Sequence, residues 1–340
     1  MDGTIRFPHL GITLTHVIKS FQVGGLEIAC YGVVLSVAMM TGMWLVMRLA
    51  KATGQKEEDY FDLGIVAILV ALVCARIYYV VFSWDYYRSH LAEIFNLRKG
   101  GLAIYGGVIG GVLTVLVFCH IRKLRYRLAL DTMSVGLVWG QVLGRWGNFF
   151  NREAFGDYTD NLFAMQLPLS DVRASEITDT MRAHLETIDG VEYIQVHPTF
   201  LYESLWNLGV LAVLLFLTYL RRKKEIRSTV TGLSGNKPSG KEPSGKESSG
   251  KEASGSKAPE IETPGSSEGT IFLMYLLLYG AGRFWIEGLR TDQLILFDTG
   301  LPVSQVLSAI LVVASLTLLI IGQLRRTKED DPKGTIKKTD

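Results

Sequence analysis

The sequence has few cysteines and no large excess of either charge, and each shortage excludes a class of protein. Only three cysteines occur among 340 residues, and Cys30, Cys74 and Cys119 each lie in or at the end of an apolar run. Neither a disulfide framework nor a metal-ligand spacing follows from them. The formal net charge is only +2, and we expect no nucleic-acid partner and no cofactor. Residues 1–24 are mixed and weakly amphipathic, so we expect no cleavable signal peptide.

Long uncharged apolar runs, by contrast, recur throughout the chain. Apolar residues make up 48% of the sequence, and about 20 of them in a row can cross a bilayer as a helix. The pattern predicts an all-α polytopic membrane protein with seven transmembrane helices. We place them at 25–47, 60–82, 101–119, 128–148, 199–220, 269–288 and 303–324.

The distribution of Lys and Arg predicts which loops lie in the cytoplasm. The connections at 48–56, 122–127 and 221–227, and the tail at 325–340, are basic, whereas the alternate segments are poorer in Lys and Arg for their length. Basic loops face the cytoplasm. The N-terminus (1–24) should therefore lie outside and the C-terminus inside. A small extracytoplasmic head of irregular and helical pieces should occupy 149–198.

Residues 228–268 differ in composition from the rest of the chain. The pentad Pro-Ser-Gly-Lys-Glu repeats from Pro238, and no aromatic or large apolar residue follows Leu233 until the segment nears its end. Such a sequence buries too little surface to offset chain entropy. We expect a disordered cytoplasmic insert. It would follow helices 1–4 (25–148) and helix 5 with its basic inner loop (199–227), and it would precede helices 6–7 (269–324). Both an inert insertion and a binding role fit this composition.

The polar stretch from Gly144 to Gly156 ends the predicted fourth helix. It places Arg145 at membrane depth, where a cation is costly unless it is paired or faces a wet cavity, and Asn148 follows one turn later. Gly136, Gly140 and Gly144 form a small-residue stripe that would let another helix approach closely. The alternative is that Arg145 anchors the helix at the membrane interface.

Further polar residues fall in the outer halves or outer mouths of several predicted spans. They are Arg76, Tyr105, His197, Glu203, Arg283, Glu287 and Arg290. Tyr279, Arg283 and Glu287 share one helical face, and Glu203 needs a cationic partner that the arginines could supply. Several arginines converging on one cavity suit an oxyanion, because guanidinium groups bind phosphate through two parallel hydrogen bonds. The residues therefore predict a site for an anionic lipid at the outer face of the inner membrane.

Five motifs resemble those of bacterial prolipoprotein diacylglyceryl transferases. The sequence GRWGNFFNREAFG (144–156) is similar to the family signature, and it is accompanied by ARIYYV (75–80), GGLAIYGGVIGG (100–111), HPTFLYES (197–204) and the set from Tyr279 to Arg290. The motifs follow the family's order and cover nearly the whole chain. The resemblance implies transfer of a diacylglyceryl group from phosphatidylglycerol to the lipobox cysteine of a prolipoprotein, at the outer leaflet of the bacterial plasma membrane, with release of glycerol phosphate.

The resemblance also implies roles for individual residues. Arg145, Asn148, Glu153 and Gly156 match the signature, Arg283 matches an essential arginine with Tyr279 and Glu287 as companions, and Tyr31 matches a tyrosine of the first helix. We predict Arg145, Arg283, Tyr105 and His197 as catalytic residues. The others, with Arg76, Glu203 and Arg290, would bind phosphatidylglycerol.

Two departures from the family pattern stand out. Many relatives have histidine where this chain has Tyr105, and glycine where it has Arg152. The first leaves two accounts of thiol deprotonation: the arginines make the thiol acidic enough, or His197 is the base.

A transporter or flippase for an anionic lipid or solute is the alternative function. It would need polar residues through the inner halves of the helices and an internal repeat. Only Asp62 and Asp131 lie inward, and we find no repeat.

Overall fold

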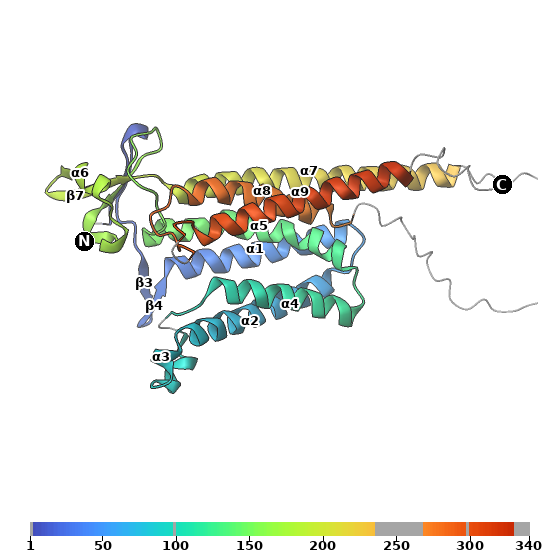
Figure 1. Cartoon of the computed structure of the whole chain (residues 1–340), viewed down its shortest axis with the longest axis horizontal. Coiled ribbons are helices and arrows are strands. Elements are labelled where there is room, and N and C mark those ends of the chain that lie inside the picture. The colour runs from blue at the N-terminus through green and yellow to red at the C-terminus, as the bar shows by residue number, and fades with distance from the viewer. Residues whose placement is uncertain (1–2, 98–99, 235–267, 297–298, 330–340) are drawn as a thin grey trace, which may run out of the picture.

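The computed structural model describes residues 3–97, 100–234, 268–296 and 299–329. Within these ranges seven long helices lie side by side (Figure 1). They are α1 (Cys30–Ala52), α2 (Glu57–Phe82), α4 (Ile104–Arg122), α5 (Tyr126–Asn151), α7 (Thr199–Ser234), α8 (Thr270–Glu287) and α9 (Val303–Glu329). Two short helices, α3 (Trp84–Tyr87) and α6 (Asp179–Ala183), lie outside the bundle.

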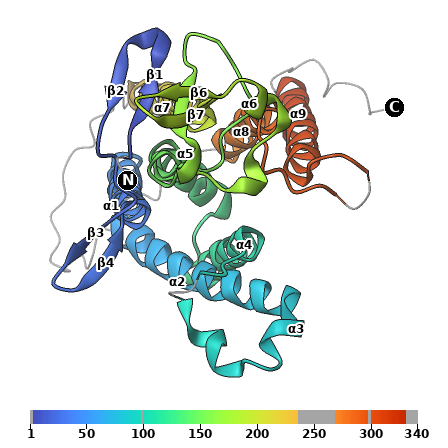
Figure 2. The same cartoon turned by 90° about the vertical axis from the view of Figure 1, so that its left-hand side faces the viewer.

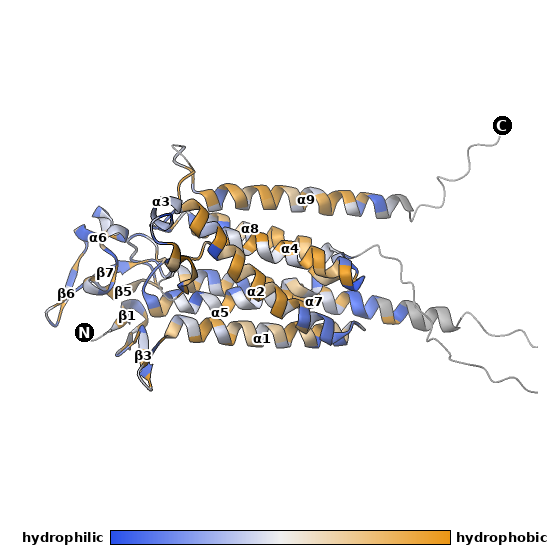
Figure 3. Cartoon of the chain, turned by 90° about the horizontal axis from the view of Figure 1, so that it is seen from below, coloured by the Kyte–Doolittle hydropathy of each residue, from blue (hydrophilic) through white to orange (hydrophobic). Residues whose placement is uncertain are grey.

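Five of the long helices are long and apolar enough to cross a membrane: α1, α2, α4, α9 and the 199–224 part of α7. Their hydrophobic residues form a band between two hydrophilic ends (Figure 3). The remaining two, α5 and α8, pack against each other and against α7. The predicted helical membrane protein is confirmed at this level.

The helices cross closely where glycines remove side chains. Gly42 of α1 and Gly136 of α5 face each other, and a Cβ on Gly42 would lie 3.2 Å from the Gly136 carbonyl oxygen. Gly106 and Gly110 of α4 leave no room for a Cβ against α2. The predicted stripe on α5 is therefore a crossing point only at Gly136, because a Cβ on Gly140 or Gly144 would meet nothing within 4 Å.

A five-stranded antiparallel sheet covers one end of the bundle (Figure 2). Its order is β2 (Ile12–Leu14), β1 (Ile5–Phe7), β5 (Met165–Pro168), β7 (Val191–Val196), β6 (Glu186–Ile188). Asp189 and Gly190, both with positive φ, make the β6–β7 hairpin turn, as Asp-Gly pairs do in two-residue hairpins. Buried Ile5, Leu167 and Ile194 belong to its core.

The sheet corrects one prediction and adds to another. The protein is not all-α, and the head at 149–198 contributes three strands, β5, β6 and β7, beside its irregular and helical pieces. It also takes its β1 and β2 from the N-terminal segment, since Arg6 pairs with Gln166. The strands are only three to six residues long, too short to give a strong alternating pattern.

Helix boundaries differ from the predicted ones at two places. A β3 (Ser20–Val23) and β4 (Leu26–Ala29) hairpin occupies the predicted start of the first helix, which begins at Cys30. At the other place, α7 continues to Ser234 and so extends into the predicted disordered insert. Residues 235–267 of that insert lie outside the described ranges.

Candidate active site

Three helices bring a chain of alternating charges together near the sheet end of the bundle. Glu203 of α7 lies between two arginines, with Oε1 2.5 Å from Arg145 Nη2 of α5 and Oε2 3.0 Å from Arg283 Nη1 of α8. Arg283 Nη2 is also 2.5 Å from Glu287 Oε2, one turn along the same helix. We call Arg145, Glu203, Arg283 and Glu287 the arginine–glutamate cluster.

The two glutamates of the cluster are buried, so each carboxylate needs a cationic partner. The side chains of Glu203 and Glu287 are only 3% and 4% exposed, against 14% for Arg283 and 20% for Arg145. Removing one member of a buried ion pair costs about 3–5 kcal/mol, because the other charge is left uncompensated. Both glutamates are thus fixed by their arginines, while each arginine keeps N–H donors that these pairs do not use.

Arg290 and Tyr279 extend the cluster at its two ends along α8. Arg290 lies 3.9 Å from Glu287 and makes two hydrogen bonds, 2.9 and 2.7 Å, to Asp292. One turn before Arg283, the Tyr279 hydroxyl faces the Arg145 guanidinium. Tyr279, Arg283 and Glu287 therefore share one face of α8, as predicted, and Tyr279 and Arg283 turn it toward Arg145 and Glu203.

A polar path leads from the cluster to the sheet. Arg145 Nη1 is 3.5 Å from Asn148 Oδ1, and Asn148 Nδ2 donates to Glu153 Oε1 at 3.2 Å. Asn151 donates to the same oxygen at 3.1 Å, and Arg173 Nη2 lies 3.3 Å from Glu153 Oε2. Because Glu153 holds the Asn148 amide nitrogen, the Asn148 Oδ1 faces Arg145.

Arg173 is a residue of this path that the sequence did not reveal. It follows β5 and lies 20 positions from Glu153, with no motif around it. It also pairs with Glu176 at 3.1 Å. Only the folded head brings it to the site.

Gly156 is placed where no side chain fits. A Cβ there would lie 2.7 Å from the Leu289 carbonyl oxygen and 2.8 Å from His197 Cβ. Gly156 also forms an antiparallel bridge with Arg290. It therefore links the end of α8, with its arginine, to the head.

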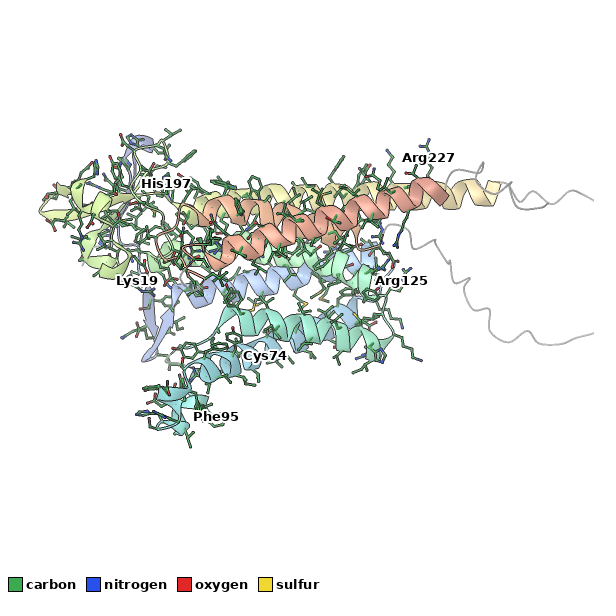
Figure 4. The ribbon with its side chains drawn as sticks, in the orientation of Figure 1. Lys19, Cys74, Phe95, Arg125, His197 and Arg227 are labelled. Atoms are coloured by element: carbon green, nitrogen blue, oxygen red, sulfur yellow. The ribbon has the colours of Figure 1, made fainter. Side chains whose placement is uncertain are left out.

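His197 lies beside the cluster rather than in it. Its Nδ1 is 3.3 Å from the Tyr202 hydroxyl and 3.5 Å from Asn161 Nδ2. Burial lowers the pKa of His197, and Asp157 opposes the shift. Figure 4 places the residue at the sheet end. These contacts are those of a residue that braces the head.

The three remaining predicted residues lie on α1, α2 and α4. Tyr31 packs its ring on Gly147, next to Asn148. Arg76 donates to backbone carbonyls of Glu93, Ile94, Asn96, Gly100 and Gly101, so it fixes the loop after α2. Tyr105 is half-buried and makes no hydrogen bond to a described residue. The structure does not join Arg76 or Tyr105 to the cluster by any contact between described side chains.

Arg152 ends α5 in the left-handed conformation, with φ 53° and ψ 53°. Glycine adopts this conformation without steric cost, which explains why a glycine suits the position. Here the arginine side chain is buried and lies 3.2 Å from Asp171, and it donates to the Gly3 carbonyl. It thus ties the N-terminal segment to the head.

Comparison with known proteins agrees with the motifs. Residues 19–233 and 258–321 match the family described as prolipoprotein diacylglyceryl transferase. Proteins named phosphatidylglycerol–prolipoprotein diacylglyceryl transferase are 37% identical in Geobacillus kaustophilus, 35% in Acaryochloris marina and 33% in Bacillus velezensis. The matches cover 90%, 91% and 90% of this chain and 92% of each relative. The chain therefore belongs to the prolipoprotein diacylglyceryl transferase family.

Proposed function

We propose that this protein transfers the diacylglyceryl group of phosphatidylglycerol to the thiol of a prolipoprotein lipobox cysteine. The names of its relatives supply both substrates. The observation that carries the proposal is the convergence of Arg145 and Arg283 on Glu203 inside an apolar bundle. A buried pair of arginines with spare donors suits a lipid phosphate. Nothing in the relatives' names favours the alternative of a transporter or flippase.

The reaction is a displacement at a glycerol carbon. The cysteine sulfur forms the new C–S bond as a thiolate, the C–O bond to the phosphate breaks, and glycerol phosphate leaves with the electron pair. Arg145 and Arg283 would bind the phosphate and neutralise the charge that develops on it. The same positive charge favours ionisation of the attacking thiol, whose ordinary pKa is ~8.5.

Glu203 would hold the guanidinium groups of Arg145 and Arg283 side by side. It forms an ion pair with each of them, so their spare N–H groups can converge on a single phosphate. Glu287 and Arg290 would continue the same positioning along α8. Tyr279 and Asn148 contact Arg145 and would bind the headgroup together with Tyr31, Glu153 and Gly156.

Two candidates for the proton acceptor have different support. Burial lowers the pKa of His197 and so favours its neutral form, but its contacts are with Tyr202 and Asn161. A phenol in water ionises only near pH ~10, so a tyrosine at position 105 is a poor base at neutral pH. We therefore infer that the arginines acidify the thiol and that neither residue is required as a base. Roles for Arg76 and Tyr105 in lipid binding stay predictions.

We further propose that all seven long helices cross the bacterial inner membrane, with the N-terminus outside, the C-terminus inside and the site at the outer leaflet. The basic residues of the α4–α5 connection lie at the end of the bundle opposite the sheet, where Figure 4 labels Arg125. Cytoplasmic loops carry such residues. The insert at 228–268 would leave the same end as a cytoplasmic loop.

Single cysteines at Ser249 and Ser175, in a background lacking the native three, test this orientation. On intact cells an impermeant maleimide should label only the cysteine at 175. Labelling at 249 alone, or at both positions, contradicts the proposed orientation and the outer-leaflet site.

The reaction itself is tested with purified protein. A lipobox peptide incubated with the enzyme and phosphatidylglycerol should gain the mass of one diacylglyceryl group. A matched peptide with serine at the lipobox cysteine should gain nothing, because its hydroxyl ionises far less readily than a thiol. A peptide that remains unmodified with well-folded enzyme would contradict the proposed activity.

A further inference from the structure

A second charged pocket opens at the end of the bundle away from the sheet. Its cavity volume is about 80 Å³. Three arginines and two acids contribute to its lining: Arg125, Asp131, Arg221, Arg222 and Glu268. Figure 4 labels Arg125 at the opposite end of the helices from His197. This basic pocket is therefore separate from the arginine–glutamate cluster.

Both acids of the basic pocket are already neutralised. Asp131 is 2% exposed and accepts the backbone N–H groups of Gly269 and Phe272, each at 2.9 Å, and Arg221 Nη1 at 2.8 Å. Glu268 Oε1 lies 2.7 Å from Arg125. These contacts balance one carboxylate with Arg125 and the other with Arg221 and the first turn of α8.

Arg222 takes part in neither of these two ion pairs. It is half-buried in the lining of the pocket, and it makes no ion pair with a carboxylate in the part of the chain that the structure describes. A half-buried arginine without a counter-ion is costly. Among its described lining residues, the pocket therefore holds one more positive charge than the two carboxylates balance.

Membrane topology alone does not require this arrangement. An arginine or lysine that only sets orientation can remain in water, as exposed Lys123 and Lys224 do beside the same helices. Arg221 and Arg222 instead line a cavity between helices. Basic pockets between membrane helices on the cytoplasmic side bind phospholipid headgroups.

We propose that the basic pocket binds a phosphate group, with Arg222 as its principal ligand and Arg125 and Arg221 beside it. The phosphate could belong to an anionic phospholipid of the adjacent leaflet or to a free phosphate ion, and the test separates these sources. The proposal is independent of the transfer reaction at the other end of the bundle.

A thiol inside the pocket gives a local readout. Thr53 lines the pocket, so Thr53→Cys in a chain without the three native cysteines reports access to it. We would measure its alkylation by N-ethylmaleimide in neutral detergent with phosphatidylcholine, adding phosphatidylglycerol in one arm. The other arm receives inorganic phosphate against sodium chloride at equal ionic strength. Transfer activity of the same variant verifies that it folds.

Bound phosphate should slow alkylation at least ~5-fold, and Arg222→Gln should raise the half-protecting concentration at least ~10-fold, since it removes a charge-assisted contact. The matched control is Arg48→Gln, an exposed arginine outside the pocket lining, which should leave protection unchanged. Protection by phosphatidylglycerol alone identifies a lipid headgroup, protection by phosphate alone identifies a free ion, and protection by both supports the shared chemistry.

The proposal is overturned if neither compound protects, or if Arg222→Gln protects as well as the parent. A second measurement covers a Thr53→Cys variant that does not fold. Native mass spectrometry should then find one anionic lipid fewer on Arg222→Gln than on Arg48→Gln, and equal counts would contradict a lipid at this site. Transfer activity of Arg222→Gln should stay within ~3-fold, because the arginine lies outside the candidate active site.

Discussion

Glu203 and Asp131 are buried carboxylates at opposite ends of one helix bundle, and they are held in different ways. Within the described residues, Glu203 is held by side chains, the guanidinium groups of Arg145 and Arg283. Asp131 accepts two backbone N–H groups at the start of α8 as well as Arg221. One carboxylate positions arginines, and the other caps a helix.

This difference distinguishes a candidate ligand-binding site at Glu203 from a helix cap at Asp131. A carboxylate at a helix start stabilises the unpaired N–H groups and the helix dipole, so its backbone partners serve the helix alone. A carboxylate between two arginines leaves each of them with donors for a ligand. We therefore expect changes at the two ends to affect different quantities, the transfer rate at one and the stability at the other.

The largest effect should come from the arginines of the cluster. Arg145→Ala or Arg283→Ala should reduce the transfer rate at least ~100-fold, as loss of one oxyanion donor does. Lysine should restore little, because it cannot make two parallel hydrogen bonds. The rate is measured at matched protein level with Arg48→Ala as control. An alanine variant with a near-normal rate would remove that arginine from the mechanism.

Substitution of the two carboxylates tests the comparison directly. Glu203→Gln should lower the transfer rate ~10-fold or more while most of the protein stays folded, since the amide keeps its volume but no longer aligns two cations. Asp131→Asn should instead destabilise the fold by about 3 kcal/mol, with the rate per folded molecule within ~3-fold of wild type.

Thermal unfolding and single-turnover transfer, measured on the same samples, separate the two outcomes. The comparison fails if Asp131→Asn is as stable as wild type but slow, or if Glu203→Gln reduces only stability.

Smaller effects are expected at Tyr105 and His197. Tyr105→Phe should cost ~10-fold or less and Tyr105→His should be tolerated. His197→Gln should act through stability. Burial lowers the pKa of His197 in the folded protein, so below the unfolded-state pKa of ~6.5 the unfolded chain binds more protons, and stability falls as pH falls.

The measurements are the pH dependence of unfolding and of transfer rate for wild type and the three variants. The loss of stability below pH ~6.5 should weaken in His197→Gln. A rate that titrates near pH ~6.5 in wild type and in both Tyr105 variants, but not in His197→Gln, would make His197 the base.

The smallest effect should come from the insert. Replacing 235–256 with a short Gly/Ser linker should change activity and folding by no more than a few-fold, because loop length affects stability only logarithmically. Membrane insertion and transfer rate are measured together. A large loss of rate with normal insertion would mean that the segment binds something the reaction needs.

Local patterns in the sequence were sufficient for the helices and for the family. The four-residue spacing of Tyr279, Arg283 and Glu287 predicted a shared face, and Arg283 does contact Glu287. Apolar runs predicted membrane helices, five of which meet a length and hydropathy criterion. The resemblance carried by the five motifs was confirmed by the family match. Each of these signals lies within one helix or one motif.

Long-range pairing is what the sequence did not predict. The sheet pairs Arg6 of β1 with Gln166 of β5, and all of the first four long helices lie between these two strands in the sequence. The same folding brings Arg173 to Glu153 and Arg152 to Asp171. Conversely, Arg76 had the depth and charge of a site residue, but the carbonyls of its own loop take up its donors. The roles of the predicted site residues stay predictions.

The most direct measurement follows both products of one reaction. Purified enzyme with phosphatidylglycerol and a lipobox peptide should yield one glycerol phosphate for each diacylglyceryl-modified peptide, and Arg283→Ala should lower both at least ~100-fold together. Modified peptide without glycerol phosphate, or an unchanged rate in Arg283→Ala, would contradict phosphate displacement at the arginine–glutamate cluster.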